Sequence, residues 1–406
     1  MLRWPVPRFA STLVAFALLV LLTGCGGGRS VPAPVISPQS PFAGGPGPAP
    51  PPSPPAAPGP VKVALLVPLS GPNAALGKSM LEAAQLALFT TGGKRLILVP
   101  RDTAGSPGGA AGAARSAISD GARLILGPLL ASEVEAVRPV ADAAHVNVIA
   151  FSTATQLAGG NVFLIGFLPR QEVVREVAFA HDRGLDRFAA MVPNSPYGHL
   201  MGDAMRQAAA TSGGTVVDTE YFDPQGGDVA AAIHRLLPAA GGAPPGPRFD
   251  ALLLPEGGNR LKDIARQLKA AGLDTHAVRL LGSGLWDDPS ISGDPALYGG
   301  WFAASPPAQR REFESHFQAT YGHPPPRLAS LAFDAAALAA VLARNDGGAP
   351  FSRDALLNPR GFTGVDGLFR FTPQGLVQRG LAVLEVTAQG GTVVSPAPQS
   401  FADLAY

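Results

Sequence analysis

The sequence predicts an α/β protein with two lobes, each built on a doubly wound, mainly parallel sheet. Short apolar runs alternate with segments of about a dozen residues whose apolar side chains recur at helical spacing, which is the pattern of βαβ units. This unit recurs more often than one sheet usually holds, so two sheets are expected. Hydrophobic residues make up 46% of the 406 residues and charged residues 15%, so the chain can bury a large core.

The first series of strands and helices begins at residue 61. The near-continuous apolar run Val61–Pro68 predicts a strand that is buried on both faces, and the spacing of apolar residues in Gly77–Phe89 predicts the helix that follows it. The next elements of this series, strands and helices in alternation, are Arg95–Val99, Ala110–Ile118, Ala122–Leu126, Ser132–Ala144 and Val146–Phe151.

A second series starts near Asn161 and supplies the second sheet. Its strands and helices are Phe188–Val192, Leu200–Ala210, Thr215–Tyr221, Val229–Leu237, Ala251–Leu254, Leu261–Ala271 and Val278–Leu281. Beyond it, Arg310–Tyr321 and Leu328–Arg344 are predicted to be amphipathic helices. Gly367–Phe371 and Leu381–Val386 are predicted to form an antiparallel pair, because a turn signal containing proline and glycine lies between them.

The N-terminus has the features of a secretory signal. Two arginines precede the apolar stretch Phe9–Leu22, which is too short to span a bilayer comfortably. Leu22–Cys25 resembles the bacterial lipobox, which implies removal of residues 1–24 and acylation of Cys25. Glycine rather than aspartate at position 26 favours the inner leaflet of the outer membrane. The alternative is a buried structural cysteine in an uncleaved segment.

Residues 25–60 are predicted to be a linker behind the lipidated cysteine. Thirteen of the thirty residues from 31 to 60 are proline, and such a stretch favours an extended polyproline II conformation over a packed core. At roughly 3.1 Å per residue it could reach on the order of 90 Å. It is either a passive tether or a stalk that carries the folded part away from its membrane.

Composition and motifs argue against several classes of function. The net charge of +1, without clustered Lys and Arg, gives no basis for nucleic-acid binding or for a membrane contact beyond the lipid anchor. The seven histidines lack metal-ligand spacing, and Cys25 is the only cysteine, so no metal or other cofactor is expected. The nucleophile-elbow, zinc-protease and P-loop motifs are absent. We therefore expect a protein without catalytic residues that is not an enzyme.

Hydroxyl-bearing loops follow several predicted strands of the first series. Their candidate ligand-binding residues are Ser70, Gly71, Ser132, Ser152, Thr153 and Thr155. Hydroxyls and backbone N–H groups at helix N-termini bind carboxylates, because the helix dipole favours an anion there. For Ser132 there is a structural alternative, since Ser132–Glu135 fits a capping box that starts a helix.

Four segments resemble the type I periplasmic binding proteins of the leucine/isoleucine/valine-binding family. These segments, in the order and spacing of that family, are Ala64–Gly77, Leu126–Ser132, Ala150–Thr155 and Val192–Gly198. The resemblance covers about residues 61–394. It implies two lobes joined by three crossovers, with a hinge and a ligand cleft between the lobes at the carboxyl ends of the strands.

The same resemblance implies approximate lobe boundaries. The N-terminal lobe is expected to comprise residues 61–168 plus 304–358. The C-terminal lobe is expected to comprise residues 169–303 plus 359–395.

Within this superfamily, the chain most resembles the lipoproteins that activate penicillin-binding proteins. The lipobox, the proline-rich stalk, Gly282–Asp288 and Gly364–Phe371 carry this narrower resemblance. It implies regulation of peptidoglycan synthesis in the periplasm, through contact with a penicillin-binding protein. The alternative is a solute-binding lipoprotein that delivers an amino acid or a similar small ligand to an ABC permease.

The family resemblance also implies ligand contacts in the second series. Tyr197 matches a cleft tyrosine of the family, although it could instead pack at a helix start, and the hydroxyls of the first series match positions that hold the ligand carboxylate. Glu256 and Asp287 are candidate acids for an ammonium group, although neither aligns with the family's ammonium-binding glutamate. Trp286 lies near that position and could fill the cleft or stack on a different ligand. An acid pointing into an open cleft would favour ligand delivery, whereas a cleft filled by Trp286 would favour the regulator.

Overall fold

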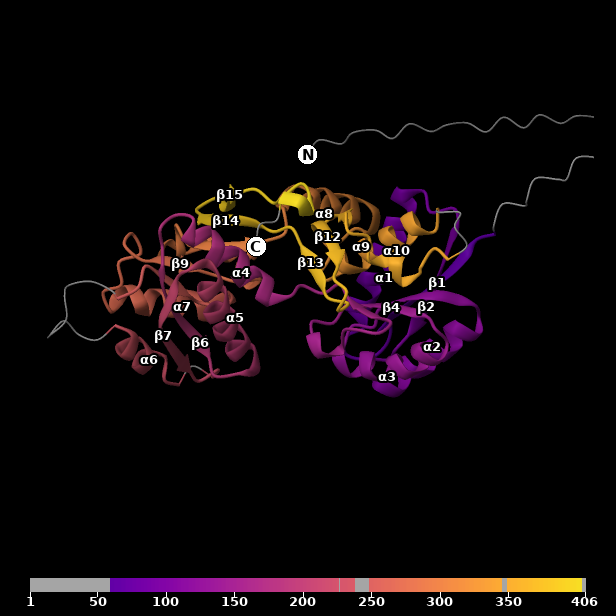
Figure 1. The fold of residues 1–406 in the computed structure, drawn as a ribbon, viewed down its shortest axis with the longest axis horizontal. Helices are drawn as coiled ribbons and strands as arrows, with labels where there is room; N and C mark the ends of the chain where they lie inside the picture. Colours follow the sequence, from indigo (N-terminus) through magenta and orange to yellow (C-terminus); the bar gives the residue numbers. More distant parts are fainter. Residues whose placement is uncertain (1–58, 226, 238–247, 345–348, 404–406) are drawn as a thin grey trace, which may run out of the picture. The chain divides into compact units, whose positions relative to one another are not determined.

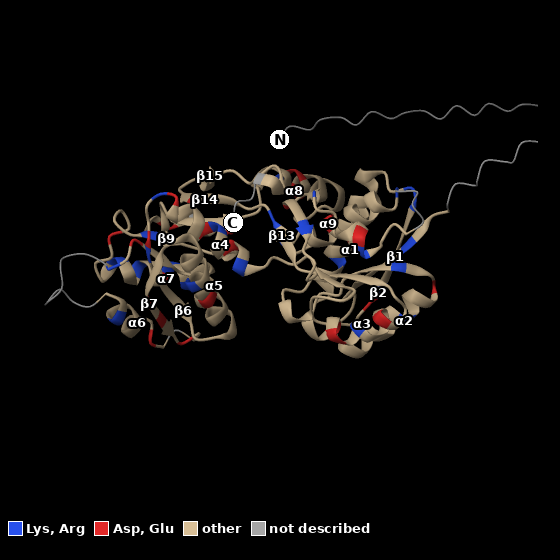
Figure 2. Ribbon diagram, in the orientation of Figure 1, with Lys and Arg blue, Asp and Glu red and all other residues tan. Residues whose placement is uncertain are grey.

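The computed structural model describes residues 59–225, 227–237, 248–344 and 349–403 (Figure 1). The predictions for the signal peptide, for Cys25 and for most of the proline-rich linker lie outside these residues. Within these ranges, no helix is both long enough and apolar enough to cross a membrane. Basic and acidic residues are interspersed along the described ribbon (Figure 2).

The first sheet is parallel throughout and has the strand order β2-β1-β3-β4-β5. Its strands are β1 (Val61–Val67), β2 (Leu96–Asp102), β3 (Ala122–Leu126), β4 (Asn147–Ala150) and β5 (Val162–Leu164). Because β1 lies inside the sheet, the side chains from Val63 to Val67 are fully buried, as the near-continuous apolar run predicts.

Helices cover both faces of this sheet. They are α1 (Ala74–Thr91), α2 (Pro107–Ser119), α3 (Ala131–Ala143), α8 (Pro307–Tyr321), α9 (Ala329–Leu342) and α10 (Arg353–Leu356). The start of α2 follows from its sequence, since the Ser106 hydroxyl accepts a hydrogen bond from the Gly109 N–H at 3.2 Å and proline occupies the first helical position. α1 begins at Ala74, before the predicted start at Gly77. Gly77 has no Cβ, which lets the helix pass against the Pro68 carbonyl.

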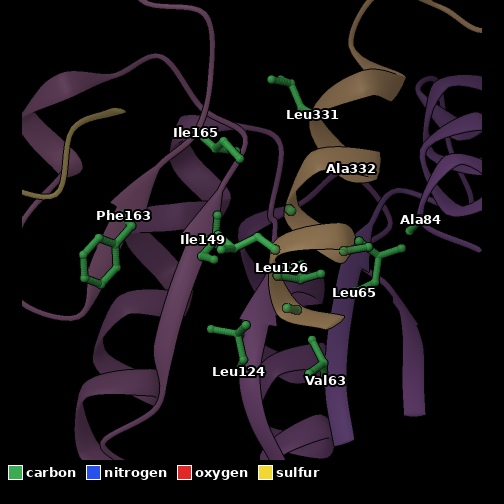
Figure 3. Close-up of a cluster of buried hydrophobic side chains, with 14 of the residues drawn as sticks. Val63, Leu65, Ala84, Leu124, Leu126, Ile149, Phe163, Ile165, Leu331 and Ala332 are labelled. Carbon is green, nitrogen blue, oxygen red and sulfur yellow. The ribbon is translucent and has the colours of Figure 1, made fainter. Parts of the chain in front are cut away.

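The core of this part lies between the sheet and the pair α1 and α9. Figure 3 shows Leu65, Leu126 and Phe163 from three strands, together with Leu331 from α9. α9 is rich in alanine and buried on almost every side, so it packs closely on α1. A helix that is apolar all round is a core element rather than the amphipathic helix that the sequence predicts for this segment.

The second sheet has the strand order β15-β14-β10-β9-β8-β6-β7. Its strands are β6 (Arg187–Pro193), β7 (Thr215–Phe222), β8 (Ala251–Leu253), β9 (Arg279–Leu281), β10 (Trp301–Ala304), β14 (Ala382–Thr387) and β15 (Gly390–Ser395). Its helices are α4 (Pro169–His181), α5 (Pro196–Ser212), α6 (Val229–Leu236) and α7 (Gly258–Ala270). β14 and β15 run antiparallel at one edge, and the other five strands are parallel.

A third, antiparallel sheet contains β11 (Phe362–Gly364), β12 (Gly367–Phe371) and β13 (Val377–Arg379). The predicted pairing of Gly367–Phe371 with Leu381–Val386 is therefore wrong. The turn is tight, because the Gly375 N–H donates to the Thr372 carbonyl at 2.8 Å, and pairing resumes at once with Val377. The later strand leaves the hairpin and pairs with β10 of the second sheet.

The chain passes between the first and second sheets at three places, which precede α4, α8 and β14. The hairpin of β12 and β13 packs in the first core, where Phe369, Phe371 and Val377 contact the same cluster as Val63. This differs from the expected grouping of residues 359–395 with the C-terminal lobe. The reason is the apolar face of the hairpin, which only the first core covers. The sheets, cores and crossovers together form the type I periplasmic binding protein fold.

Candidate ligand-binding site

The carboxyl ends of β1, β3 and β4 lie at one edge of the first sheet, because these neighbouring strands are parallel. This edge carries all the hydroxyl-bearing candidates of the first series. Ser70 and Gly71 follow β1, Ser132 lies in the first turn of α3, and Ser152, Thr153 and Thr155 follow β4. Ser152 is buried, whereas Ser70, Ser132, Thr153 and Thr155 are exposed.

The Ser70 loop is already bound to a carboxylate of the chain itself. The Ser70 hydroxyl donates to Asp102 Oδ2 at 2.6 Å, and the backbone N–H groups of Leu69 and Ala104 donate to Oδ1 at 2.8 and 2.7 Å. Although slight burial opposes it, these hydrogen bonds lower the pKa of Asp102. The Asp102 carboxylate thus accepts the hydrogen bonds of a loop that the sequence analysis expected to bind a ligand carboxylate.

Ser132 does not cap its helix. α3 begins one residue earlier, at Ala131, and the Glu133 carboxylate accepts a hydrogen bond from the Leu130 N–H at 3.1 Å. The capping interaction is therefore shifted by two residues, from the predicted Ser132–Glu135 box to Leu130–Glu133. The exposed Ser132 hydroxyl remains at the carboxyl edge of the sheet.

Tyr197 and Glu256 lie at the carboxyl ends of β6 and β8 in the second sheet. The Tyr197 hydroxyl donates to Ser283 Oγ at 3.2 Å, and its pKa is raised by burial and by the nearby carboxylates of Glu172, Glu176 and Glu256. Glu256 is half-buried, and burial raises its pKa against the opposing charge of Arg260. The two predicted residues thus share one acidic environment.

Trp286 belongs to the second core. Its indole is 2% exposed, donates to the Leu254 carbonyl at 3.1 Å and packs beside Phe302. Gly282 and Gly300 make room for it, since a Cβ at either position would collide with the ring. The expectation that Trp286 fills the cleft or stacks on a ligand therefore has no support in this geometry, because the ring is directed into the protein interior.

A cavity of about 240 Å³ lies where the crossovers meet. It is lined by residues from the crossovers, from α4 and α5, and from the loop after β9. The lining consists of Phe167, Pro169, Glu172, Tyr197, Gly284, Leu285, Asp287, Ala304, Ser305, Arg327, Leu328 and Leu381. Of the residues predicted to contact a ligand, Tyr197 and Asp287 lie in this wall.

Glu172 is the charged group that α4 contributes to the cavity. Its Oε2 accepts a hydrogen bond from the Gly284 N–H at 2.7 Å. Among the residues that the structure describes, none donates to Oε1 and no cation lies within ion-pair distance of the carboxylate. Burial raises the pKa of Glu172 to about 7; the charge of Asp287 adds to this, while Arg327 and the Gly284 N–H oppose it.

The other charged groups of the wall are paired. Arg310 from α8 binds both carboxylate oxygens of Asp287, with Nη2 at 2.9 Å from Oδ1, and both side chains are largely buried. Arg327 lies 2.9 Å from the fully buried Asp366 and 3.9 Å from Asp287, with its guanidinium over the Phe167 ring. Asp287 therefore joins the loop after β9 to α8 and to the start of α9.

The sequence analysis missed Glu172, Arg310 and Arg327 as parts of a site. Glu172 lies on α4, Arg310 on α8 and Arg327 just before α9, and no sequence motif marks any of them. The crossovers bring these helices together, so only the tertiary structure reveals the cluster. In the parts of the chain that are described, no group of three or more histidine, cysteine or acidic residues could hold a metal ion.

A family model described as periplasmic binding protein matches residues 60–392. The chain belongs to this family. Membership implies a periplasmic location and agrees with the fold, with its crossovers and with the polar groups at the carboxyl ends of the strands.

Similar proteins include a Leu/Ile/Val-binding protein of Rhizobium johnstonii, which is 26% identical over 43% of this chain and 51% of its own length. The chain spans about half the length of the curated relatives that it matches. Among solved structures, an ABC transporter substrate-binding protein from Sphaerobacter thermophilus has a TM-score of 0.66 and 23% identity, over 84% of this chain and 98% of that one. A solute-binding protein from Rhodopseudomonas palustris in complex with benzoate has a TM-score of 0.58 and 19% identity, over 86% and 99%.

Proposed function

We propose that this periplasmic binding protein captures a small solute and delivers it to an ABC permease. The observation that carries the proposal is the cavity where the crossovers meet, because its wall holds Glu172, a half-buried carboxylate without a cation at ion-pair distance among the described residues, beside Tyr197. A concave, mostly apolar site with a few polar groups of perturbed pKa is the usual form of a small-molecule site. The relatives named for solute binding support the same function.

In this proposal the two sheets contribute different contacts to the ligand. Tyr197 contacts it in the cavity wall on the side of the second sheet. Glu256 from the second sheet and Ser152, Thr153 and Thr155 from the first lie outside that wall, and we propose them as contacts for any part of the ligand that extends beyond the cavity. Ser70 and Gly71 act only as part of the loop that Asp102 holds. Ser132 is a peripheral contact, and Trp286 supports the site from the core without touching the ligand.

The competing hypothesis is that the protein regulates peptidoglycan synthesis by contacting a penicillin-binding protein. The sequence analysis favoured it because of the proline-rich stalk and the narrower family resemblance, and named a cleft filled by Trp286 as further support. Trp286 packs in the second core instead, and Asp287 lines the cavity, so the geometry supports ligand delivery better. The sequence analysis expected an acid that points into an open cleft if the protein delivers a ligand. Asp287 lines the cavity, although Arg310 already pairs with it.

Membrane attachment is part of the proposal. Acylation of Cys25 would anchor the chain, and residues 26–60 would tether the folded part. A solute receptor acts on a permease of the inner membrane, so the tether must allow contact with that membrane. The lobe boundaries of the sequence analysis are retained, except that residues 362–379 are placed with the N-terminal lobe.

A thermal-shift screen of the purified full-length protein tests the proposal. The panel contains amino acids, aliphatic amines, carboxylates and muropeptides. A ligand that binds only the folded protein stabilises it by about 2.7 kcal/mol at a hundred times its dissociation constant, which gives a saturable rise in Tm. If no small molecule raises Tm and a purified penicillin-binding protein is retained, the regulator replaces the receptor.

Two tyrosine variants show whether such a rise comes from this cavity. Tyr197→Ala should weaken binding, because Tyr197 lies in the wall. Tyr321→Ala is the matched control, since Tyr321 is also half-buried and its hydroxyl donates to the Glu82 carbonyl at 2.8 Å on the outer side of α1 and α8. Equal loss of binding in both variants would contradict a site at this cavity.

A further inference from the structure

A phenylalanine ring projects into solvent near the C-terminal end of α1. Phe89 is 87% exposed, whereas the other large apolar side chains on the surface of the described chain are at most 49% exposed. A single exposed ring needs no explanation unless apolar surface adjoins it. Here it does, because Leu86 and Thr90, which neighbour Phe89 on the same helix, line a cavity of about 280 Å³.

This second cavity, the α8 hole, lies between α1, α8, α9 and the turn from β11 to β12. Its lining consists of Leu86, Thr90, Gln309, Glu312, Phe313, His316, Phe333, Gly364 and Val365. Phe313 and Phe333 form its aromatic part, with their ring centroids 5.2 Å apart. The hole shares no lining residue with the cavity where the crossovers meet, so solute capture there gives no reason for it. A cavity of about 150 Å³ holds a benzene molecule, so the α8 hole has room for a phenyl ring.

The ring and the hole lie next to one another on one helix, and this points to the kind of partner. In a two-fold dimer the same patch of both copies meets itself, so a contact from one copy to the other occurs twice. A patch that carries both a projecting ring and a ring-sized hole is complementary to itself. A second copy of the chain would therefore bury Phe89 and fill the hole in a single association.

The charges beside the ring and the hole are also complementary. Glu312 is exposed on the wall of the hole, and Lys94 is exposed just beyond the end of α1 that carries Phe89. Neither side chain forms an ion pair with another described residue. When two copies meet in the two-fold arrangement, the base near each ring approaches the acid beside the opposite hole. Such rim charges contribute orientation and specificity more than affinity.

We propose that two copies of this protein associate through this face, with Phe89 of each copy inserted into the α8 hole of the other. A contact built on one ring and one hole from each copy is smaller than the roughly 800 Å² per partner of a standard interface. The dimer is therefore weak, with a dissociation constant in the micromolar range. This inference does not depend on the proposed function, because it uses neither the cavity where the crossovers meet nor any solute.

Sedimentation equilibrium of the full-length protein in a density-matched detergent tests the inference, over concentrations from low micromolar to several hundred micromolar. We expect a reversible monomer–dimer equilibrium. Phe89→Ala should raise the dissociation constant by more than about a hundredfold, because each dimer loses two buried rings. Val217→Ala is the matched control, since Val217 is 45% exposed on β7 of the second sheet, and it should leave the equilibrium unchanged. A monomer at every concentration, or a Phe89→Ala protein that dimerises as tightly as wild type, would overturn the inference.

A mixing experiment tests whether the contact is reciprocal. Thr90→Trp fills the hole but keeps Phe89, and Thr90 bonds only to the Leu86 and Ala87 carbonyls of its own helix, so the fold should be retained. Alone it should dimerise as poorly as Phe89→Ala. In an equimolar mixture, the ring of the Thr90→Trp protein meets the open hole of the Phe89→Ala protein, so one of the two contacts forms again. The mixed dimer should be at least about tenfold tighter than either variant alone. No gain in the mixture would overturn the reciprocal arrangement.

Discussion

Replacing Glu172 by glutamine should change the pH dependence of stability in a defined way. The pKa of Glu172 is raised from 4.5 to about 7, mainly by burial, with Asp287 adding to the rise and Arg327 opposing it. Between these pH values the folded protein retains a proton that the unfolded chain releases, so the free energy of unfolding falls as pH rises. At about 1.4 kcal/mol per pKa unit, ionisation of Glu172 costs about 3 kcal/mol above pH 7.

Glu172→Gln removes this cost, because glutamine stays neutral. The variant should match wild type near pH 4.5 and become more stable as pH rises, by up to about 3 kcal/mol at pH 8. Urea titrations of both proteins at several pH values measure the difference, in which the other carboxylates cancel. The charged and titratable groups that face Glu172 are Arg327, Asp287, Glu176 and Tyr197, and all are unchanged in the variant.

Glu176→Gln provides a second test of the same reasoning. Burial raises the pKa of Glu176 well above its ordinary value, so this variant should also gain stability relative to wild type as pH rises, because the unfolded chain releases a proton that the folded protein retains. A difference between wild type and Glu172→Gln that is flat from pH 4.5 to 8 would refute the reasoning. It would mean that Glu172 has a cationic partner or ready access to water.

Three further predictions concern residues outside that carboxylate. Trp286→Ala should cost about 3–5 kcal/mol of stability, because it leaves a cavity in the core between Gly282 and Gly300. The loss would be measured as a lower urea midpoint, and a loss below about 1 kcal/mol would show that the ring is not packed there. Asp287→Asn should destabilise the protein more than replacing Asp287 and Arg310 together, with a coupling of about 1–3 kcal/mol in a double-mutant cycle, since the single change leaves a largely buried guanidinium with Glu314 as its remaining carboxylate partner. Additive effects would contradict the pair. Asp102→Ala should speed amide hydrogen exchange at Leu69 and Ala104 while leaving the core amides protected, because it removes the acceptor of the loop after β1; unchanged exchange at these amides would argue against the acceptor role.

The architecture was largely predictable from local patterns. Val61–Pro68 predicted a buried central strand, and β1 occupies that place, because burial on both faces leaves a continuous apolar run. The order of strands and helices up to β9 followed from the same alternation, except that β5 and α4 were not predicted and β5 belongs to the first sheet rather than the second. The pairing of Gly367–Phe371 was mispredicted, because a turn signal shows where a chain reverses but not how soon it leaves the hairpin.

The candidate site was predictable only in part. Loops at the carboxyl ends of strands follow from the fold class, so Tyr197 and the hydroxyls after β4 were predicted to lie at such ends; of these, Tyr197 lies in the cavity wall. Glu172 was not, because its burial and its lack of a partner arise from contacts with a loop more than a hundred positions later in the chain. Trp286 was placed on the wrong side of its loop, since sequence does not reveal whether an aromatic side chain turns towards a cleft or a core.

The hairpin of β12 and β13 has a consequence for how the protein must be assembled. Phe369 and Phe371 complete the same core as Val63, so the two ends of the described chain meet in one packed unit. Because the chain emerges with its N-terminus first, this packed unit cannot form completely until nearly all of the chain has emerged. The second sheet likewise waits for β14 and β15. Contacts of such long range slow folding, so the exported polypeptide should stay open, and exposed to proteases and chaperones, until its last strands arrive.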